Sequence, residues 1–220
     1  MLDTNLTQAR QNMITQQIRP WGVTDAGVLK LMSQTPRENF VPPQYRQLAF
    51  VDMAIPIGNG QVMMPPRLEA RLLQALAIKA DEIVLEIGTG RAYLTALLAQ
   101  LAHHVYSVEQ VAELKQAAEL QLAAQGLDNI TLELGDALNG WPQHGSYNVI
   151  VVTGSLPVLP QELLNSLAIG GRLFAVVGET PVMQARLVTR KSEHEWEEEI
   201  IFETELPPLF NAPQAAHFSL

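Results

Sequence analysis

The sequence predicts an α/β fold in which a doubly wound, mostly parallel sheet follows an N-terminal helical layer. From Val84 onward, short apolar runs rich in β-branched residues alternate with helical patterns. Several of these runs are apolar throughout, as in strands that a parallel sheet buries on both faces. Because parallel strands are joined by right-handed crossovers, the alternation predicts a right-handed doubly wound sheet.

The first predicted strand, residues 84–87, contains Glu86 and runs into a Gly-Thr-Gly loop at residues 88–90. Glycines let the backbone turn sharply and approach a ligand, and the helix that follows begins with unpaired N–H groups. A dinucleotide fingerprint would need a third glycine at position 93, which is Tyr93. The spacing acid-x-Gly-x-Gly-x-Gly, which the chain matches except for Ala92 at its last glycine, resembles instead the methionine-binding loop of S-adenosylmethionine (SAM) methyltransferases.

Acidic residues also follow the next two predicted strands. Residues 104–108 form the second strand, and Glu109 at its end lies 109 − 86 = 23 residues beyond Glu86. A carboxylate there can accept hydrogen bonds from both hydroxyls of a ribose, in NAD and SAM folds alike. After a helix over residues 112–124, the third strand ends at Leu134 and is followed by Asp136. Open α/β sheets bind ligands at the carboxyl ends of their strands, so these acids predict a nucleoside site.

The remaining core elements continue the alternation. We expect a fully apolar strand over residues 148–153, a short helix over 160–167 and a strand over 172–177. Residues 184–190 and 195–203 alternate well enough for a closing hairpin. A methyltransferase-like core is therefore expected from residue 67 to residue 220.

The N-terminal third, residues 1–66, is expected to form a separate layer. Apolar residues from Leu6 to Ile18 recur at helical spacing, and Pro20 marks the end of that helix. A second helix is capped by Thr24 or Asp25. A proline-punctuated connector follows as an ordered wall, which we expect to close over the carboxyl ends of the strands.

Composition excludes several classes of protein. The formal charge is −9 with no basic cluster, which disfavours binding to nucleic acid. The chain has no cysteine, so disulfides and thiolate metal sites are excluded, and its histidines show no metal-ligand spacing, so no metal is expected. Polar and charged residues among the first 19 argue against a signal peptide or membrane span. A cytoplasmic location is expected by default, and the oligomeric state stays open.

Several segments resemble those of protein-L-isoaspartate O-methyltransferases. These are residues 55–61 (IPIGNGQ), 86–90 (EIGTG), 106–109 (YSVE), 140–142 (GWP), 147–153 (YNVIVVT) and 170–173 (GGRL). The resemblance implies a seven-stranded class I methyltransferase sheet, SAM as cofactor, and a protein or peptide carboxylate as acceptor. In that family the acceptor is the abnormal carboxylate of isoaspartyl residues, and its methylation starts their repair.

The resemblance also implies roles for individual residues. The cofactor would be bound by Glu86, Gly88, Thr89, Gly90, Glu109, Gln110, Asp136, Ala137 and Thr153, with Asp136 facing the adenine amino group. The family commonly has Thr-Ile-Ser after Gly-Gln, with the serine hydroxyl in the acceptor pocket. This chain has Val62-Met63-Met64, which puts Met64 at the serine position. Thr153 and Ser155 are the hydroxyls expected to compensate.

A second departure is Arg91-Ala92, where the family usually has Ser-Gly. Alanine at position 92 costs about 1–2 kcal/mol if the backbone there is left-handed, and little otherwise. Three functions remain open at this point: an isoaspartyl carboxyl methyltransferase, a SAM methyltransferase with another acceptor, favoured by Met63 and Met64, and a SAM-binding protein without catalysis.

Overall fold

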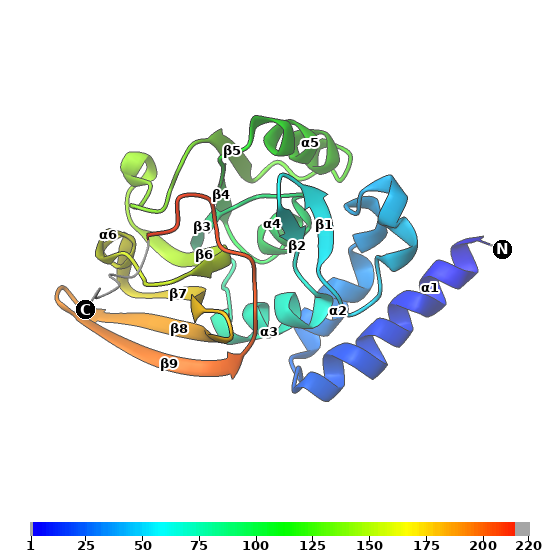
Figure 1. The fold of residues 1–220 in the computed structure, drawn as a ribbon, viewed down its shortest axis with the longest axis horizontal. Coiled ribbons are helices and arrows are strands. Elements are labelled where there is room, and N and C mark those ends of the chain that lie inside the picture. The colour runs from blue at the N-terminus through cyan, green and yellow to red at the C-terminus, as the bar shows by residue number, and fades with distance from the viewer. Residues whose placement is uncertain (1, 214–220) are drawn as a thin grey trace.

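A computed structural model describes residues 2–213 and contains the predicted seven-stranded sheet (Figure 1). The strands are β3 (Ile83–Ile87), β4 (His104–Glu109), β5 (Ile130–Leu134), β6 (Tyr147–Leu156), β7 (Leu167–Glu179), β8 (Val182–Ser192) and β9 (Glu195–Glu203). Their order is β5-β4-β3-β6-β7-β8-β9. The pairs from β5 through β7 are parallel, and β8 and β9 close the sheet as an antiparallel hairpin. The predicted fold class and closing hairpin are confirmed.

The order of the strands reverses at β3. After β3 the chain moves outward through α4 (Tyr93–Ala99) to β4, and through α5 (Ala112–Ala123) to β5. It then returns to the other side of β3 as β6, and α6 (Gln161–Asn165) leads on to β7. In open α/β sheets, such a switch point leaves a crevice beyond the carboxyl ends of the strands. The Gly-Thr-Gly loop after β3 lies at this crevice.

The N-terminal layer contains helical segments followed by a hairpin. Helix α1 (Leu2–Asn12) continues through π-helical residues Met13–Ile18 into a short 3-10 turn, Arg19–Trp21. Helix α2 (Ala26–Gln34) is capped by Asp25, whose Oδ1 accepts a 2.9 Å hydrogen bond from the Val28 amide. The 3-10 turns Arg37–Asn39 and Pro43–Leu48 follow. Strands β1 (Ile55–Gly58) and β2 (Gln61–Met63) then pair antiparallel, before α3 (Pro66–Leu76).

The hairpin between β1 and β2 turns on Asn59-Gly60. Both residues have positive φ, +52° and +71°, which two-residue hairpin loops of this twist require. Asn-Gly is the strongest short sequence signal for such a hairpin, but its location within a proline-rich connector obscured it. The finding adds a β element to a layer that the sequence predicted as helices and connector.

Apolar side chains cover both faces of the sheet. Successive residues of β3 and β6 point to opposite faces, so Val84 and Val149 join one buried cluster while Leu85 and Ile150 join the other. The first cluster also contains Met13, Ile18, Met32 and Phe40 of the N-terminal layer, together with residues of α3 and α4. This shared core fixes the layer against the sheet.

The chain after β9 runs back across the end of β6, a path that the sequence did not predict (Figure 1). Ser155 holds it: its amide donates to the Pro207 carbonyl at 2.9 Å, its carbonyl accepts from the Leu209 amide at 3.1 Å, and its hydroxyl donates to the Leu206 carbonyl at 2.8 Å. We call residues 206–211 the C-terminal strap. Among the described residues 2–213, no helix is long and apolar enough to cross a membrane.

Candidate active site

Two adjoining pockets lie beyond the carboxyl ends of β3, β4 and β5. The first encloses about 500 Å³, and we call it the outer pocket; the second encloses about 330 Å³, and we call it the inner pocket. Ile57, Val62, Gly88 and Gly90 line both. The β1–β2 hairpin is therefore a wall between the pockets, and the N-terminal layer borders the site.

The glycine loop after β3 permits this close packing. Gly88 has a φ of +93°, and a Cβ there would lie 2.3 Å from the Thr153 hydroxyl oxygen, so only glycine fits. The Thr153 hydroxyl contacts the carbonyls of Ile87 and Gly88 at 3.0 and 2.7 Å. Ala92 has a φ of +64°. Position 92 is thus left-handed, and alanine is strained there where the family has glycine.

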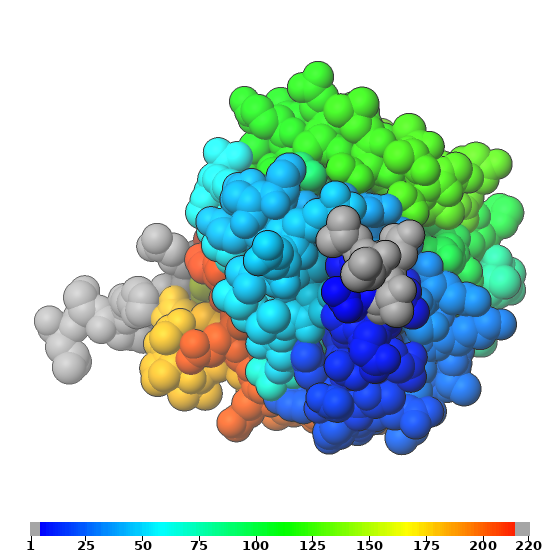
Figure 2. Space-filling model, turned by 90° about the vertical axis from the view of Figure 1, so that its right-hand side faces the viewer, coloured from blue at the N-terminus to red at the C-terminus, as the bar shows by residue number. Residues whose placement is uncertain are grey.

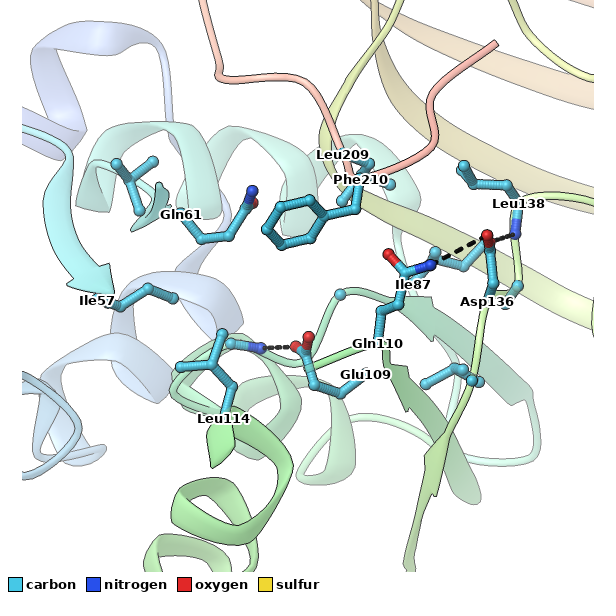
Figure 3. A pocket seen from close by; sticks show the side chains of 16 residues that line it. Ile57, Gln61, Ile87, Glu109, Gln110, Leu114, Asp136, Leu138, Leu209 and Phe210 are labelled. Atoms are coloured by element: carbon cyan, nitrogen blue, oxygen red, sulfur yellow. Dashed lines mark hydrogen bonds between the residues drawn. The ribbon is translucent and has the colours of Figure 1, made fainter. Parts of the chain in front are cut away.

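Glu109 joins β4 to the glycine loop (Figure 3). Its Oε2 accepts from the Gly90 amide at 2.8 Å and its Oε1 from the Val111 amide at 3.0 Å. The side chain lines the outer pocket, and the residue is only 5% exposed. Each oxygen of an ionised carboxylate accepts about two hydrogen bonds, so both oxygens can still receive a hydroxyl. The arrangement suits a vicinal diol such as that of a ribose.

Asp136 lines the outer pocket at the end away from the β1–β2 hairpin (Figure 3). Its Oδ1 accepts from the Leu138 amide, and its Oδ2 accepts from the side-chain amides of Gln110 and Asn211, each at 3.1 Å. These three bonds leave capacity for about one further donor. Ala137, beside Asp136, is buried and lines the same pocket.

The C-terminal strap completes the outer pocket. Leu209 and Phe210 line it, and Asn211 ties the strap to Asp136. In Figure 3 the Phe210 ring lies between Gln61 of the hairpin and Gln110 after β4. These residues were not predicted from the sequence because the segment has no helical or alternating pattern. Its only signal was the pair Pro207-Pro208, which marks irregular chain without showing where it goes.

Glu86 is a fully buried acid of the inner pocket with one unpaired oxygen. Its Oε2 accepts from Thr95 and Ser107 hydroxyls, each at 2.6 Å, whereas Oε1 has no partner among the described residues. Burial raises the pKa of this carboxyl to about 8, with a smaller contribution from Glu109. The neighbouring Thr89 hydroxyl lies 2.6 Å from the Ser107 hydroxyl. Leaving a buried polar atom without a hydrogen bond destabilises the folded protein, so we expect a ligand to donate a hydrogen bond to Oε1.

Met63, Met64 and Glu69 also line the inner pocket. The guanidinium of Arg37, which is fully buried, forms an ion pair with Glu69 and donates to the carbonyls of Met64 at 2.6 Å and Ala49 at 2.9 Å. Burial raises the pKa of Glu69 to about 7, opposed by the charge of Arg37. Arg37 therefore fixes the loop after β2 to the N-terminal layer and to α3.

The three expected acceptor-side residues lie in different places. Met64 and Thr153 both line the inner pocket, but the Thr153 hydroxyl is already engaged by the glycine-loop carbonyls. Ser155 lines neither pocket, is 1% exposed, and donates its hydroxyl to the strap. The expectation that Ser155 compensates for the missing serine is therefore corrected: β6 runs on to Leu156, which turns this side chain toward the strap. Among the described residues, no group of potential metal ligands gathers.

Comparison with known proteins decides the family. Residues 8–211 match the family "Protein-L-isoaspartate(D-aspartate) O-methyltransferase (PCMT)". The chain belongs to this family. A protein-L-isoaspartate O-methyltransferase of Pelobacter propionicus is 38% identical over 209 residues, which cover 94% of this chain and 93% of that protein. One of Rhodopseudomonas palustris is 43% identical over 175 residues, covering 80% and 71% of the two chains.

Solved structures agree in fold. A Plasmodium falciparum protein described as a putative protein-L-isoaspartate O-methyltransferase, in complex with S-adenosyl-L-homocysteine, matches with a TM-score of 0.77 at 19% identity. The match covers 93% of this chain and 97% of that one. A second protein-L-isoaspartate O-methyltransferase matches with a TM-score of 0.78 at 22% identity, covering 92% and 66%. The class I methyltransferase fold expected from the sequence is thus confirmed.

Proposed function

We propose that the protein transfers the methyl group of SAM to the carboxylate of isoaspartyl residues in damaged proteins or peptides. Family membership over residues 8–211 supports the reaction class. The observation that carries the cofactor assignment is Glu86, which lines the inner pocket beside the glycine loop and whose buried Oε1 has no partner among the described residues. An α-ammonium group is the donor that this oxygen needs, and SAM has one.

The residues of both pockets fit the parts of SAM. Glu109 would accept hydrogen bonds from the two ribose hydroxyls, and Asp136 would accept a further hydrogen bond from the adenine amino group. Glu86 would hold the α-ammonium group, while Gly88 and Gly90 let the backbone approach the methionine part. Phe210 and Leu209 cover the nucleoside from the strap side. Gln110 and Ala137, which line the outer pocket, and Thr89, which lines the inner pocket, would contact the cofactor as parts of the pocket walls.

When bound, SAM would supply a methyl group on a positively charged sulfur: a carboxylate oxygen would bond to the methyl carbon as the carbon–sulfur bond breaks, and S-adenosylhomocysteine would leave. An aspartyl-type carboxyl ordinarily has a pKa of about 4 and is already ionised at neutral pH, so no general base is required. The protein has to align the acceptor oxygen and remove part of its water. The buried Arg37, by holding the Met64 carbonyl, fixes the wall against which the acceptor would lie.

The direct test is transfer of a labelled methyl group from SAM to an isoaspartyl peptide, with the isomeric aspartyl peptide as control. The proposal expects a base-labile methyl ester on the isoaspartyl peptide alone. Equal labelling of both isomers, or SAM binding without ester formation, would refute it. Substituting Glu109→Ala in parallel ties any signal to this site rather than to a contaminating enzyme.

A second acceptor class is favoured by one observation. The inner pocket is lined by the thioethers of Met63 and Met64 and by the buried carboxyl of Glu69, so position 64 offers no hydroxyl to a carboxylate. The hydroxyl of this pocket that has no hydrogen-bond partner among the described residues is that of Tyr93. A thioether donates no hydrogen bond to an anion, so a neutral acceptor would also fit beside Met63 and Met64, whereas Arg91 of the same pocket favours an anion. Turnover of SAM with a cell extract, but not with isoaspartyl peptides, would support this alternative.

A further inference from the structure

A cleft on the outside of the glycine loop contains two arginines without acidic partners among the described residues. It encloses about 670 Å³, between the 3-10 turns of the N-terminal layer and the last turn of α5. Figure 2 shows this face, where the light-blue segment around residues 37–48 meets green α5. Arg46 and Arg91 line the cleft together with the amide side chains of Asn39, Gln121 and Gln125.

Both guanidinium groups retain free donors. Arg91 donates from Nε to the Phe40 carbonyl at 3.1 Å, and Arg46 donates from Nη2 to the Asn39 side-chain oxygen at 3.2 Å. Neither forms an ion pair within residues 2–213, although Arg10, Arg37, Arg67, Arg172 and Arg186 all do. Burial lowers the pKa of Arg91, since no nearby carboxylate offsets its desolvation. Arg19, Arg71 and Arg190 also form no ion pair within the described residues, so what distinguishes Arg46 and Arg91 is that they line one cleft together.

The charges around the cleft leave it positive. Glu38 also lines it; its Oε1 is paired with Arg10 at 2.5 Å, whereas its Oε2 is buried and has no hydrogen-bond partner among the described residues, so the one negative charge of Glu38 is balanced by Arg10. The C-terminal end of α5 contributes a partial negative charge of about half a unit, which two full positive charges exceed. The cleft is therefore suited to an anion, and the planar guanidinium groups and amide donors match a carboxylate.

The cleft adjoins the proposed acceptor site through a single residue. Arg91 directly follows the glycine loop and lines both the inner pocket and the cleft. An arginine side chain spans about two residues of extended peptide. A polypeptide with one carboxylate at the inner pocket would place residues a few positions away over the cleft.

We propose that the cleft formed by Arg46 and Arg91 binds a second carboxylate of the acceptor polypeptide, from an acidic side chain or a chain terminus near the damaged residue. This inference rests on the proposed function and adds a substrate preference to it. The protein would select isoaspartyl sites within acidic sequence.

The test compares pairs of isoaspartyl peptides that differ by Glu or Gln at one position, up to four residues on either side, all with amidated ends. A further pair compares a free with an amidated C-terminus, which separates the two sources of the carboxylate. Binding to the protein with S-adenosylhomocysteine is measured by fluorescence anisotropy, and kcat/KM is measured with SAM. The variants are Arg46→Gln, Arg91→Gln and the double variant. Arg19→Gln, at an exposed arginine outside the described pockets, is the control.

We expect the wild type to favour the acidic member at one or more positions by about three- to tenfold at low salt, the range of a few partly exposed ion pairs. High salt should bring the ratio between the Glu and Gln peptides closer to one. Each single variant should reduce it, the double variant should abolish it, and Arg19→Gln should keep it. A ratio near one at every position, or a ratio that survives the double variant, overturns the inference.

The two measurements separate this inference from the proposed function. Methyl transfer without any acidic preference would overturn the cleft assignment alone. An arginine-dependent acidic preference in binding, without methyl transfer to any peptide, would overturn the proposed function and leave the cleft assignment standing. No binding of any peptide would overturn both.

Discussion

The Glu109 carboxylate accepts the Gly90 amide at 2.8 Å, so the acid after β4 holds the glycine loop after β3 in place. One side chain thus shapes the loop and offers its remaining lone pairs to a ligand. We expect Glu109→Ala to weaken SAM binding by about 1–3 kcal/mol, through lost hydrogen bonds to a charged group. Titration calorimetry measures this effect, and Glu113→Gln, at an exposed acid on α5, is the control. Unchanged affinity in Glu109→Ala would remove Glu109 from the cofactor site.

Met64→Ser should raise methyl transfer to isoaspartyl peptides without changing SAM affinity. A hydrogen bond to a charged group contributes about 1.5–3 kcal/mol, which corresponds to roughly one to two decades in rate. Removing the buried Met64 side chain also leaves a cavity, so thermal stability is measured alongside kcat/KM. Met63→Ser, on the same wall, is the matched control and should not raise activity. If Met64→Ser lowers the rate of a stable protein, the pocket positions its acceptor by other groups.

Ala92→Gly should stabilise the protein. The left-handed conformation costs alanine about 1–2 kcal/mol, and the greater freedom of unfolded glycine returns about 0.4–1 kcal/mol of this. A net gain in unfolding free energy of about 0–1.6 kcal/mol, the difference between these two ranges, is expected from denaturant titration. Ala96→Gly, inside α4, should instead destabilise by about 1 kcal/mol. Equal losses in both variants would show that position 92 is not strained.

Asn211→Gly tests the strap. Glycine keeps the left-handed backbone, which has a φ of +59° at Asn211, and removes only the amide that donates to Asp136. SAM affinity should fall by about two- to tenfold, as for the loss of one hydrogen bond of about 0.5–1.5 kcal/mol. Gln161→Gly, at an exposed amide on α6, gives the effect of an unrelated substitution. Wild-type affinity in Asn211→Gly would mean that the strap covers the pocket without this bond.

SAM binding should release a proton near neutral pH. The pKa of Glu86 in the free protein is raised to about 8, so the carboxyl is largely protonated at pH 7. An ammonium group at Oε1 favours the ionised form, so affinity should rise with pH until the pH passes that pKa and then level off. Calorimetry in buffers of different ionisation enthalpy counts the proton. Glu86→Gln should abolish the proton release. The release that remains in Glu69→Gln shows how much of it does not come from Glu69.

The same shift has a consequence for stability in the free protein. The folded-state pKa of Glu86 lies above the ordinary value of 4.5 for this side chain, so folding is favoured by protonation. Its contribution to stability is greatest at acid pH and falls as the pH rises from about 4.5 to about 8. As the pH is raised over this interval, the thermal unfolding temperature of the wild type should therefore fall relative to that of Glu86→Gln. A difference between the two proteins that does not depend on pH would contradict the raised pKa.

Local sequence patterns were sufficient to predict the sheet and those pocket residues that directly follow a strand. The apolar runs, the Gly88-Thr89-Gly90 loop and the acids Glu109 and Asp136 are each readable because strand, loop and acid are adjacent in the chain. Their convergence follows from the shared edge of parallel strands. Asn59-Gly60 could have been read as a hairpin from its turn chemistry alone.

The remaining site residues depend on contacts between distant segments. Glu69 reads as a polar position of an amphipathic helix, and only the packing of α3 brings it to Arg37 and the inner pocket. Phe210 and Asn211 reach the outer pocket because Ser155 binds the strap, a contact that no periodicity encodes. The direction of the Ser155 side chain depends on how far β6 extends, and strand ends are the least predictable part of an element.

The most direct test of the central claim uses an aged protein with mapped isoaspartyl and aspartyl sites. The full chain is incubated with it and methyl-labelled SAM, and the sites of label are located by mass spectrometry under acidic conditions that preserve esters. We predict that label appears at isoaspartyl residues, is absent from ordinary aspartyl residues, and falls with Glu109→Ala at a SAM concentration below the dissociation constant of that variant. Label on ordinary carboxylates or on other side chains, or no label despite SAM binding, would contradict the proposed function.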